Sequence, residues 1–210
     1  MASKTKTRHI AVTFGVFLLV MASLVAQPVS ARSLRDDPAL PGLASFVQSV
    51  RDGDRNTPRG VYAEGLFAFP IVQQPDHDSA YVSAQPNVVT EFSTASAYGN
   101  IGLLAHDFLA GQYFAQLAVG QKIQLIGGDG QIENFAVTQI YRYQATDPSS
   151  VYSHFIDLSS QETLSSTELF TKVYAGPMHI TFQTCIEANG DMSWGRLFVI
   201  AEPQAATAAQ

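Results

Sequence analysis

The chain has 210 residues, which is enough for one domain with its own hydrophobic core. Eighteen Asp and Glu against twelve Lys and Arg give a formal net charge of −6, and the portion after residue 31, which contains nine of those cations, carries −9. Such an acidic surface argues against nucleic acid and anionic lipid headgroups as ligands and favours neutral or cationic partners. Apolar residues make up 46% of the chain, so a core can form without disulfides or metal.

The first 31 residues are typical of a secretory signal peptide. A basic start precedes the apolar stretch Ile10–Val25, and small residues stand at Val29 and Ala31, where a signal peptidase reads the chain. We expect cleavage before Arg32. The alternative is an uncleaved membrane anchor, although the apolar stretch is shorter than the roughly 20 residues of a span. Either reading predicts an extracellular or cell-surface protein that meets the membrane only through this segment if it is uncleaved.

Residues 32–59 are expected to form an N-terminal helix and linker. Apolar side chains recur there at three- and four-residue spacing, which predicts a helix over residues 36–56 packed on the following domain. Residues 60–203 are predicted to be that domain, and the small residues of 204–210 to be a disordered tail.

The domain is expected to consist mostly of strands, because short aromatic and β-branched runs alternate with turn residues. The predicted strands are residues 61–70, 88–92, 101–105, 121–126, 132–143, 178–185 and 194–201. Gly127–Gly130 predicts a hairpin turn, and a capping box at Ser165–Glu168 predicts a short helix through Lys172. The fold class is therefore all-β: a closed or nearly closed barrel of seven or eight strands with one or two peripheral helices.

Cys185 is the only cysteine, so it has no disulfide partner within the chain. In an exported protein such a thiol pairs with another molecule, stays buried, or performs chemistry. In a strand with a period of two, even-numbered residues from Ile180 to Thr184 take one face and odd-numbered residues from His179 to Cys185 the other. The second face is polar, which favours a groove floor with the thiol at the end of a strand.

A nucleophilic thiol needs a proton partner, and elimination favours His106. The chain has four other histidines: His9 in the signal segment, His77 and His154 in turn-rich regions, and His179 about 20 Å away along the same strand. His106 ends a predicted strand, and two strand ends of one barrel can meet at one rim.

Arg196 is the candidate group for holding a developing oxyanion, since its guanidinium is charged at any working pH. It begins the last predicted strand after a loop expected over residues 186–195. Such a connection brings Arg196 back near Cys185.

Three segments resemble those of the sortases. Thr181-Phe-Gln-Thr-Cys185 resembles their Thr-Leu-X-Thr-Cys signature, Asn100–His106 resembles the segment that carries their histidine, and Gly195–Val199 resembles the strand that carries their arginine. The resemblance runs from about Gly65 to Glu202 with these residues in the same order. It departs in two places: Phe replaces the usual Leu of the signature, and an Ala stands where a Gly often precedes the histidine.

The resemblance implies a cysteine transpeptidase on an eight-stranded barrel. Cys185 would attack a backbone carbonyl in a sorting motif of the Leu-Pro-X-Thr-Gly type and form a thioacyl enzyme. An amine of the cell wall, such as peptidoglycan, or of another protein would then take the acyl group. His106 would transfer protons, and Arg196 would hold substrate and oxyanion.

Five residues near these motifs are candidate substrate contacts: Thr184, Thr181, Gln183, Ala105 and Trp194. For Trp194 the alternative is a packed tryptophan at the barrel end. We expect no cofactor. Calcium assists some sortases, but the spacing of Asp76, Asp78 and Glu91 matches no ligand loop.

Two further functions are open. One is a secreted, non-catalytic barrel that binds peptide or glycan and carries an inert thiol. The other is a thiol hydrolase that resolves the same thioacyl intermediate with water.

Overall fold

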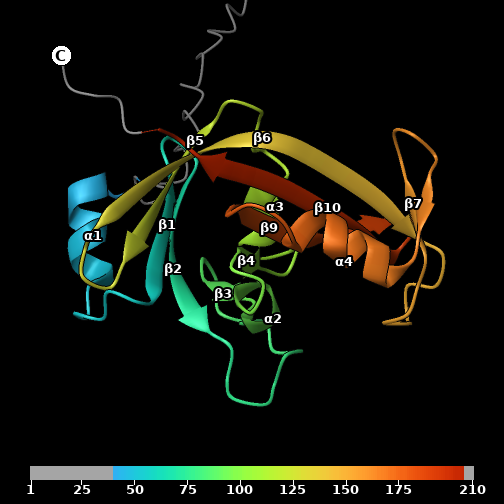
Figure 1. The fold of residues 1–210 in the computed structure, drawn as a ribbon, viewed down its shortest axis with the longest axis horizontal. Coiled ribbons are helices and arrows are strands. Elements are labelled where there is room, and N and C mark those ends of the chain that lie inside the picture. Colours follow the sequence, from blue (N-terminus) through green and yellow to red (C-terminus); the bar gives the residue numbers. More distant parts are fainter. Residues whose placement is uncertain (1–39, 206–210) are drawn as a thin grey trace, which may run out of the picture. The chain divides into compact units, whose positions relative to one another are not determined.

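A computed structural model describes residues 40–205 (Figure 1). The expected signal segment and the last five residues lie outside the described residues, as does the beginning of the expected N-terminal helix. No helix within residues 40–205 is long and apolar enough to cross a membrane.

The described chain is built around one closed sheet. Its strands are β1 (Pro58–Ala63), β2 (Phe67–Gln73), β3 (Val89–Glu91), β4 (Ile101–Leu104), β5 (Lys122–Gly127), β6 (Ile132–Ala145), β7 (Phe155–Asp157), β8 (Thr163–Leu164), β9 (Ile180–Ala188) and β10 (Asp191–Pro203). Eight strands pair in the order β10-β9-β4-β3-β2-β1-β5-β6, and β6 pairs with β10 to close the ring. The predicted closed barrel is confirmed, and β7 and β8 extend from β6 outside it.

Four short helices accompany the strands: α1 (Leu43–Val50), α2 (Ser93–Ser96), α3 (Gly111–Phe114) and α4 (Ser166–Tyr174). The sequence predicted only one or two, because α2 and α3 are single turns that leave no periodic signal. Helix α1 is shorter than the expected span 36–56. After Val50 the chain turns to bond with the barrel, where the N–H groups of Asp52 and Gly53 donate to the carbonyl of Gly128 at 3.1 and 2.8 Å.

Two predicted connections were wrong. The run 61–70 is not one strand but the β1–β2 hairpin, which turns at Gly65 with φ +74°. The expected loop over 186–195 is a tight turn at Asn189-Gly190, where φ is +55° and +78°. Asn-Gly is the preferred pair for such a hairpin turn, so the sequence contained this signal. As a result Cys185 lies within β9 rather than at its end.

Aromatic rings fill the barrel interior. Phe114 of α3 is fully buried, and its ring packs edge-on to Phe67 at 6.3 Å and to Phe182 at 5.1 Å between centroids. Edge-to-face pairs of this kind are favourable beyond the apolar area they bury. The single turn α3 is therefore anchored by a side chain inserted into the barrel.

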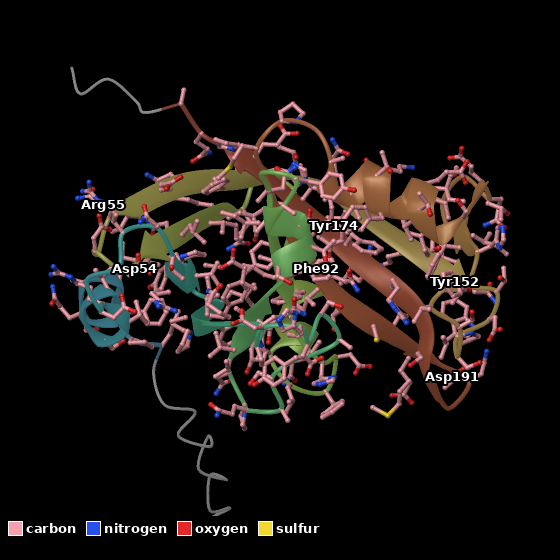
Figure 2. All side chains as sticks on the ribbon, turned by 60° about the horizontal axis from the view of Figure 1, so that its bottom comes forward. Asp54, Arg55, Phe92, Tyr152, Tyr174 and Asp191 are labelled. Atoms are coloured by element: carbon pink, nitrogen blue, oxygen red, sulfur yellow. The ribbon has the colours of Figure 1, made fainter. Side chains whose placement is uncertain are left out.

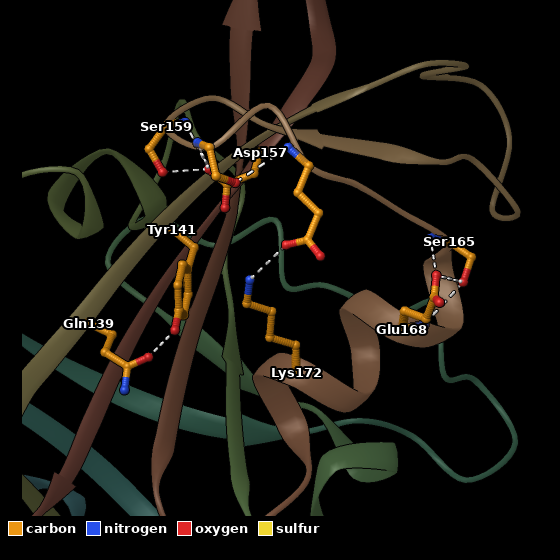
Figure 3. Close-up of polar contacts among 9 residues, drawn as sticks. Gln139, Tyr141, Asp157, Ser159, Ser165, Glu168 and Lys172 are labelled. Carbon is orange, nitrogen blue, oxygen red and sulfur yellow. Dashed lines mark hydrogen bonds and ion pairs between the residues drawn. The ribbon is translucent and has the colours of Figure 1, made fainter.

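Helix α4 covers the outer face of β9 and β10. It begins with the predicted capping box, in which the backbone N–H of Ser165 donates to the Glu168 carboxylate and the N–H of Glu168 donates to the Ser165 hydroxyl (Figure 3). Leu169, Val173 and Tyr174 from this helix form a second buried cluster with Phe198 of β10 and other residues. Figure 1 shows α4 beside β10, with β7 farther out.

Candidate active site

Cys185 and Arg196 are brought together by the β9–β10 hairpin. They are direct partners in the antiparallel register. Directly opposite residues point their side chains to the same face, with Cα atoms about 4.5–5.5 Å apart. The strand pairing thus places a guanidinium beside the thiol, although the expected loop between them is absent.

His106 follows β4, which pairs with β9 on the side away from β10. Strands β4 and β9 run parallel, with Leu104 level with Gln183, and the N–H of Ala105 donates to the carbonyl of Gln183 at 3.2 Å. His106 lies two residues beyond Leu104, and Cys185 lies two residues beyond Gln183. Neighbouring strands lie about 4.8 Å apart. Arg196 of β10 is thus the direct partner of Cys185, and β4 on the other side of β9 leads into His106.

The surroundings of Cys185 favour the neutral thiol. The side chain is half-buried, and this burial raises the pKa of the thiol above its ordinary value. The Arg196 guanidinium lowers the pKa of Cys185, whereas the carboxylates of Asp107 and Asp191 raise it further. Burial and the two carboxylates outweigh the guanidinium, so the net effect of the surroundings is to raise the pKa of Cys185.

Arg196 is held against its own strand. Its Nη1 donates to the carbonyls of Ser193 at 3.0 Å and Gly195 at 2.8 Å. Two hydrogen bonds to backbone fix the direction of the planar guanidinium, which carries five N–H donors. The strand register and these bonds together orient the charge on the face that carries the thiol.

The segment after His106 is a compact turn. The carbonyl of His106 accepts hydrogen bonds from the N–H groups of Leu109 and Gly111, both at 3.0 Å. The ring of Phe108 stacks on the imidazole with centroids 5.3 Å apart and an interplanar angle of 20°. The imidazole is thus backed by an aromatic ring that is itself exposed to solvent.

A pocket of about 350 Å³ extends from this face along α4. Its lining is mostly apolar: Phe92, Ser150, Val151, Phe155, Ser166, Leu169, Phe170, Val173, Tyr174, Gln183, Arg196 and Phe198. Two of its polar side chains belong to the Cys185 face, because Gln183 lies two residues before Cys185 on β9 and Arg196 lies opposite it. Figure 2 labels Phe92 and Tyr174, whose rings pack edge-on at 5.3 Å along this wall.

Of the five candidate substrate contacts, only Gln183 lines this pocket. Gln183 lines the pocket and accepts a hydrogen bond from the Tyr174 hydroxyl. Trp194 is half-buried on β10 and does not line the pocket. Ala105 is buried and belongs to the barrel core.

The two threonines do not reach the pocket. Thr181 shares the face of Gln183, but α4 covers it completely and its hydroxyl donates to the carbonyl of Val173. The polar face was therefore misjudged as open groove floor over its whole length. Thr184 lies on the opposite face, 4% exposed, and its hydroxyl has no hydrogen-bond partner within the described residues.

The three carboxylates Asp76, Asp78 and Glu91 do not form a metal site. Asp76 and Asp78 are exposed in the β2–β3 connection, while Glu91 is buried on β3 and accepts a hydrogen bond from the Ser96 hydroxyl. Over residues 40–205 no three His, Cys, Asp or Glu side chains are grouped to hold a metal ion.

Sequence reasoning missed the groups that shape the site around its central residues. Asp107 affects the thiol because the chain leaves β4 after Leu104 and then turns, which a period of two does not predict. The apolar wall supplied by α4 was also missed. Leu169 and Phe170 follow the capping box directly, and an amphipathic helix after a cap has an apolar face that must cover something.

No family model matches the chain, and no curated protein matches it. Among solved structures the chain is similar to sortases. One is sortase C1 from Streptococcus suis, at 13% identity over 79% of this chain and 80% of that chain, with a TM-score of 0.49. Another is sortase A from Corynebacterium diphtheriae, at 15% identity over 72% and 62%, with a TM-score of 0.46. A third is a sortase D5 transpeptidase from Clostridium perfringens, at 13% identity over 79% and 90%, with a TM-score of 0.45.

Proposed function

We propose that this protein is an exported cysteine transpeptidase of the sortase type. One observation supports the proposal: Arg196 is the direct partner of Cys185, the paired strand β4 leads into His106, and Arg196 lines a mostly apolar pocket. A sulfur nucleophile, a proton carrier and a fixed positive charge are the groups that acyl transfer through a thioester requires.

The first half-reaction cleaves the peptide. The Cys185 sulfur attacks the carbonyl carbon of the scissile bond while His106 takes the thiol proton. The tetrahedral oxyanion forms beside Arg196, whose charge stabilises it. The carbon–nitrogen bond then breaks, His106 gives the proton to the leaving amine, and the acyl group remains on sulfur as a thioester.

The second half-reaction transfers the acyl group. An acceptor amine enters in place of the leaving peptide, and the neutral imidazole of His106 takes its proton as nitrogen attacks the thioester carbon. The carbon–sulfur bond breaks, the proton returns to Cys185, and a new amide leaves the site. Water in place of the amine would give hydrolysis.

The apolar pocket supports a peptide substrate. Aromatic and aliphatic side chains of α4 and β10 can bury an apolar residue of a sorting motif, which we take to be of the Leu-Pro-X-Thr-Gly type. Gln183 and Arg196 offer polar contacts to the peptide backbone at the side of the pocket that faces the thiol.

Export and the acceptor are inferred from the chain's composition. The basic and apolar start supports delivery to the cell exterior. The net charge of −9 after residue 31 favours an acceptor that carries an ammonium group, on a cell-wall component or on another protein.

The test is peptide transfer by the purified protein. A Leu-Pro-X-Thr-Gly peptide library is offered with and without an amine, and mass spectrometry follows the thioester, the ligated product and the acid; C185S serves as the blank. Ligated product supports the proposal. Acid alone in the presence of amine indicates a thiol hydrolase, and no acyl-enzyme with any peptide indicates a binding protein with an inert thiol.

A further inference from the structure

We propose that Gly111 is a positioning residue for His106. Its missing side chain lets the turn after His106 seat against Thr184, and this contact sets the imidazole beside Cys185. The inference rests on the proposed function for its meaning, but it concerns a distance that can be measured without turnover.

Gly111 is not required by backbone conformation. It begins α3, and it is absent from the glycines of the described chain that have positive φ. Space is the reason. A Cβ built on Gly111 would lie 2.6 Å from the carbonyl oxygen and 2.9 Å from the carbonyl carbon of His106, and closer still to the Thr184 hydroxyl. Real Cβ atoms do not approach that closely, so any side chain here forces a displacement.

The displacement cannot be taken up by α3 moving outward. Phe114 holds this single turn inside the barrel between Phe67 and Phe182, and Ala110 is fully buried as well. Withdrawing α3 would uncover those rings. The carbonyl of His106 is also bonded to the N–H of Gly111 itself at 3.0 Å. The backbone of His106 and the side chain of Thr184 are therefore the parts that must move.

Through Thr184, the turn after His106 also contacts the strand that carries the thiol. Thr184 directly precedes Cys185 on β9 and is buried toward the barrel interior. Gly111 thus touches the backbone of the proton carrier on one side and the neighbour of the nucleophile on the other. A shift of about 1 Å between reacting groups can cost about a hundredfold in rate.

The first experiment compares G111A with G42A. Gly42 is a matched control, because it has φ −61° and nothing within 4 Å of a built Cβ. We expect G111A to lower kcat for the sorting peptide at least about tenfold with KM nearly unchanged and a melting temperature lower by only a few degrees, and G42A to change none of them. Adding T184A to G111A removes one of the two close contacts and should restore part of kcat.

The second experiment needs no turnover. In H106C the second thiol lies two residues after Leu104, whose partner Gln183 lies two residues before Cys185, and a disulfide requires a Cα separation of about 4.4–6.8 Å. We expect disulfide formation in a glutathione buffer to be about tenfold slower in H106C/G111A than in H106C or H106C/G42A. If G111A does not fold, T184A alone, which loosens the same contact, should slow both kcat and cross-linking.

Unchanged kcat together with an unchanged cross-linking rate in G111A would overturn the assignment. So would a loss of kcat that follows the loss of folded protein while cross-linking stays fast. If the unaltered protein transfers no peptide, the proposed function fails, and the cross-linking rates still decide the role of Gly111.

Discussion

Cys185 and Arg196 are direct partners across the β9–β10 ladder, so the guanidinium shares the sheet face of the thiol. Burial raises the pKa of Cys185, and Arg196 is the group that opposes this effect most. The guanidinium thus has two parts in the proposed reaction: it increases the thiolate fraction before attack and stabilises the oxyanion after it.

Replacing Arg196 with Ala should therefore change both the pKa of the Cys185 thiol and the rate of peptide turnover. Without the positive charge the pKa of Cys185 rises further, so the midpoint of the rate of iodoacetamide labelling against pH should move to higher pH. Peptide turnover should fall by about a hundredfold or more, as expected for loss of an oxyanion-stabilising group. R142A is the control, because Arg142 is exposed on β6 and has no part in the thiol's pKa shift. An unmoved midpoint in R196A would remove the electrostatic role of Arg196.

Asp107 should change the pKa of Cys185 in the direction opposite to Arg196. Its carboxylate raises the pKa of Cys185, so D107N should move the labelling midpoint to lower pH and speed labelling at pH 7. The shift should be smaller than that of R196A, because Arg196 has the larger effect on the thiol. D76N, in the exposed β2–β3 connection, should leave the profile unchanged. A shift to higher pH in D107N would contradict this account.

The barrel could be predicted from sequence because each strand carries its own local pattern of apolar residues. Alternating apolar residues fix strands such as β5 and β6, and a barrel follows once enough strands must bury one face. The parallel pairing of β4 with β9 could not be derived in this way, since register between distant strands depends on packing of the whole sheet. His106 was reached by elimination, and the pairing brings the strand that leads into it next to the strand of Cys185.

The errors also have physical causes. Thr181 and Gln183 share one strand face, but α4 covers the first and leaves the second at the pocket, and nothing in the strand itself distinguishes them. The role of Gly111 depends on a close approach between two segments far apart in sequence. Such contacts appear only when the fold is assembled.

Asp157 should stabilise the two strands outside the barrel. Burial raises its pKa, but hydrogen bonds from the Ser159 hydroxyl and the N–H groups of Ser159 and Ser160 outweigh burial and lower it (Figure 3). The charged form is therefore favoured in the folded state. Its contribution to stability is complete above the ordinary value of 3.8 and is lost as pH falls through the lower folded value.

D157A should thus lower the free energy of unfolding by about 2 kcal/mol at pH 7, because it removes a buried acceptor and leaves its donors unpaired. Thermal unfolding at pH 7 and pH 3 measures this. The difference between D157A and the unaltered protein should shrink at pH 3, and S149A, in the exposed turn before β7, is a control that removes a hydroxyl. An equal difference at both pH values would show that the charge is not responsible.

The cap of α4 should be worth a measurable part of the stability. S165A removes the hydroxyl that accepts from the N–H of Glu168, at a cost of about 1 kcal/mol, which corresponds to a melting temperature about 2–4 °C lower. The conservative variant S165T retains a hydroxyl and should lose much less. If S165A and S165T unfold at the same temperature as the unaltered protein, the capping box contributes nothing.

Val151 and Tyr152 give the sharpest test of the pocket, because the two neighbours are equally exposed at 82% and only Val151 lines it. Replacing either with Ser changes exposed surface, so neither V151S nor Y152S should alter the melting temperature by more than about 1–2 °C. If an apolar residue of the peptide lies in the pocket, V151S removes part of its apolar contact and should raise KM about tenfold with kcat unchanged. Y152S should have the KM of the unaltered protein. Equal KM values for V151S and Y152S would mean that the peptide binds elsewhere on the face of Cys185.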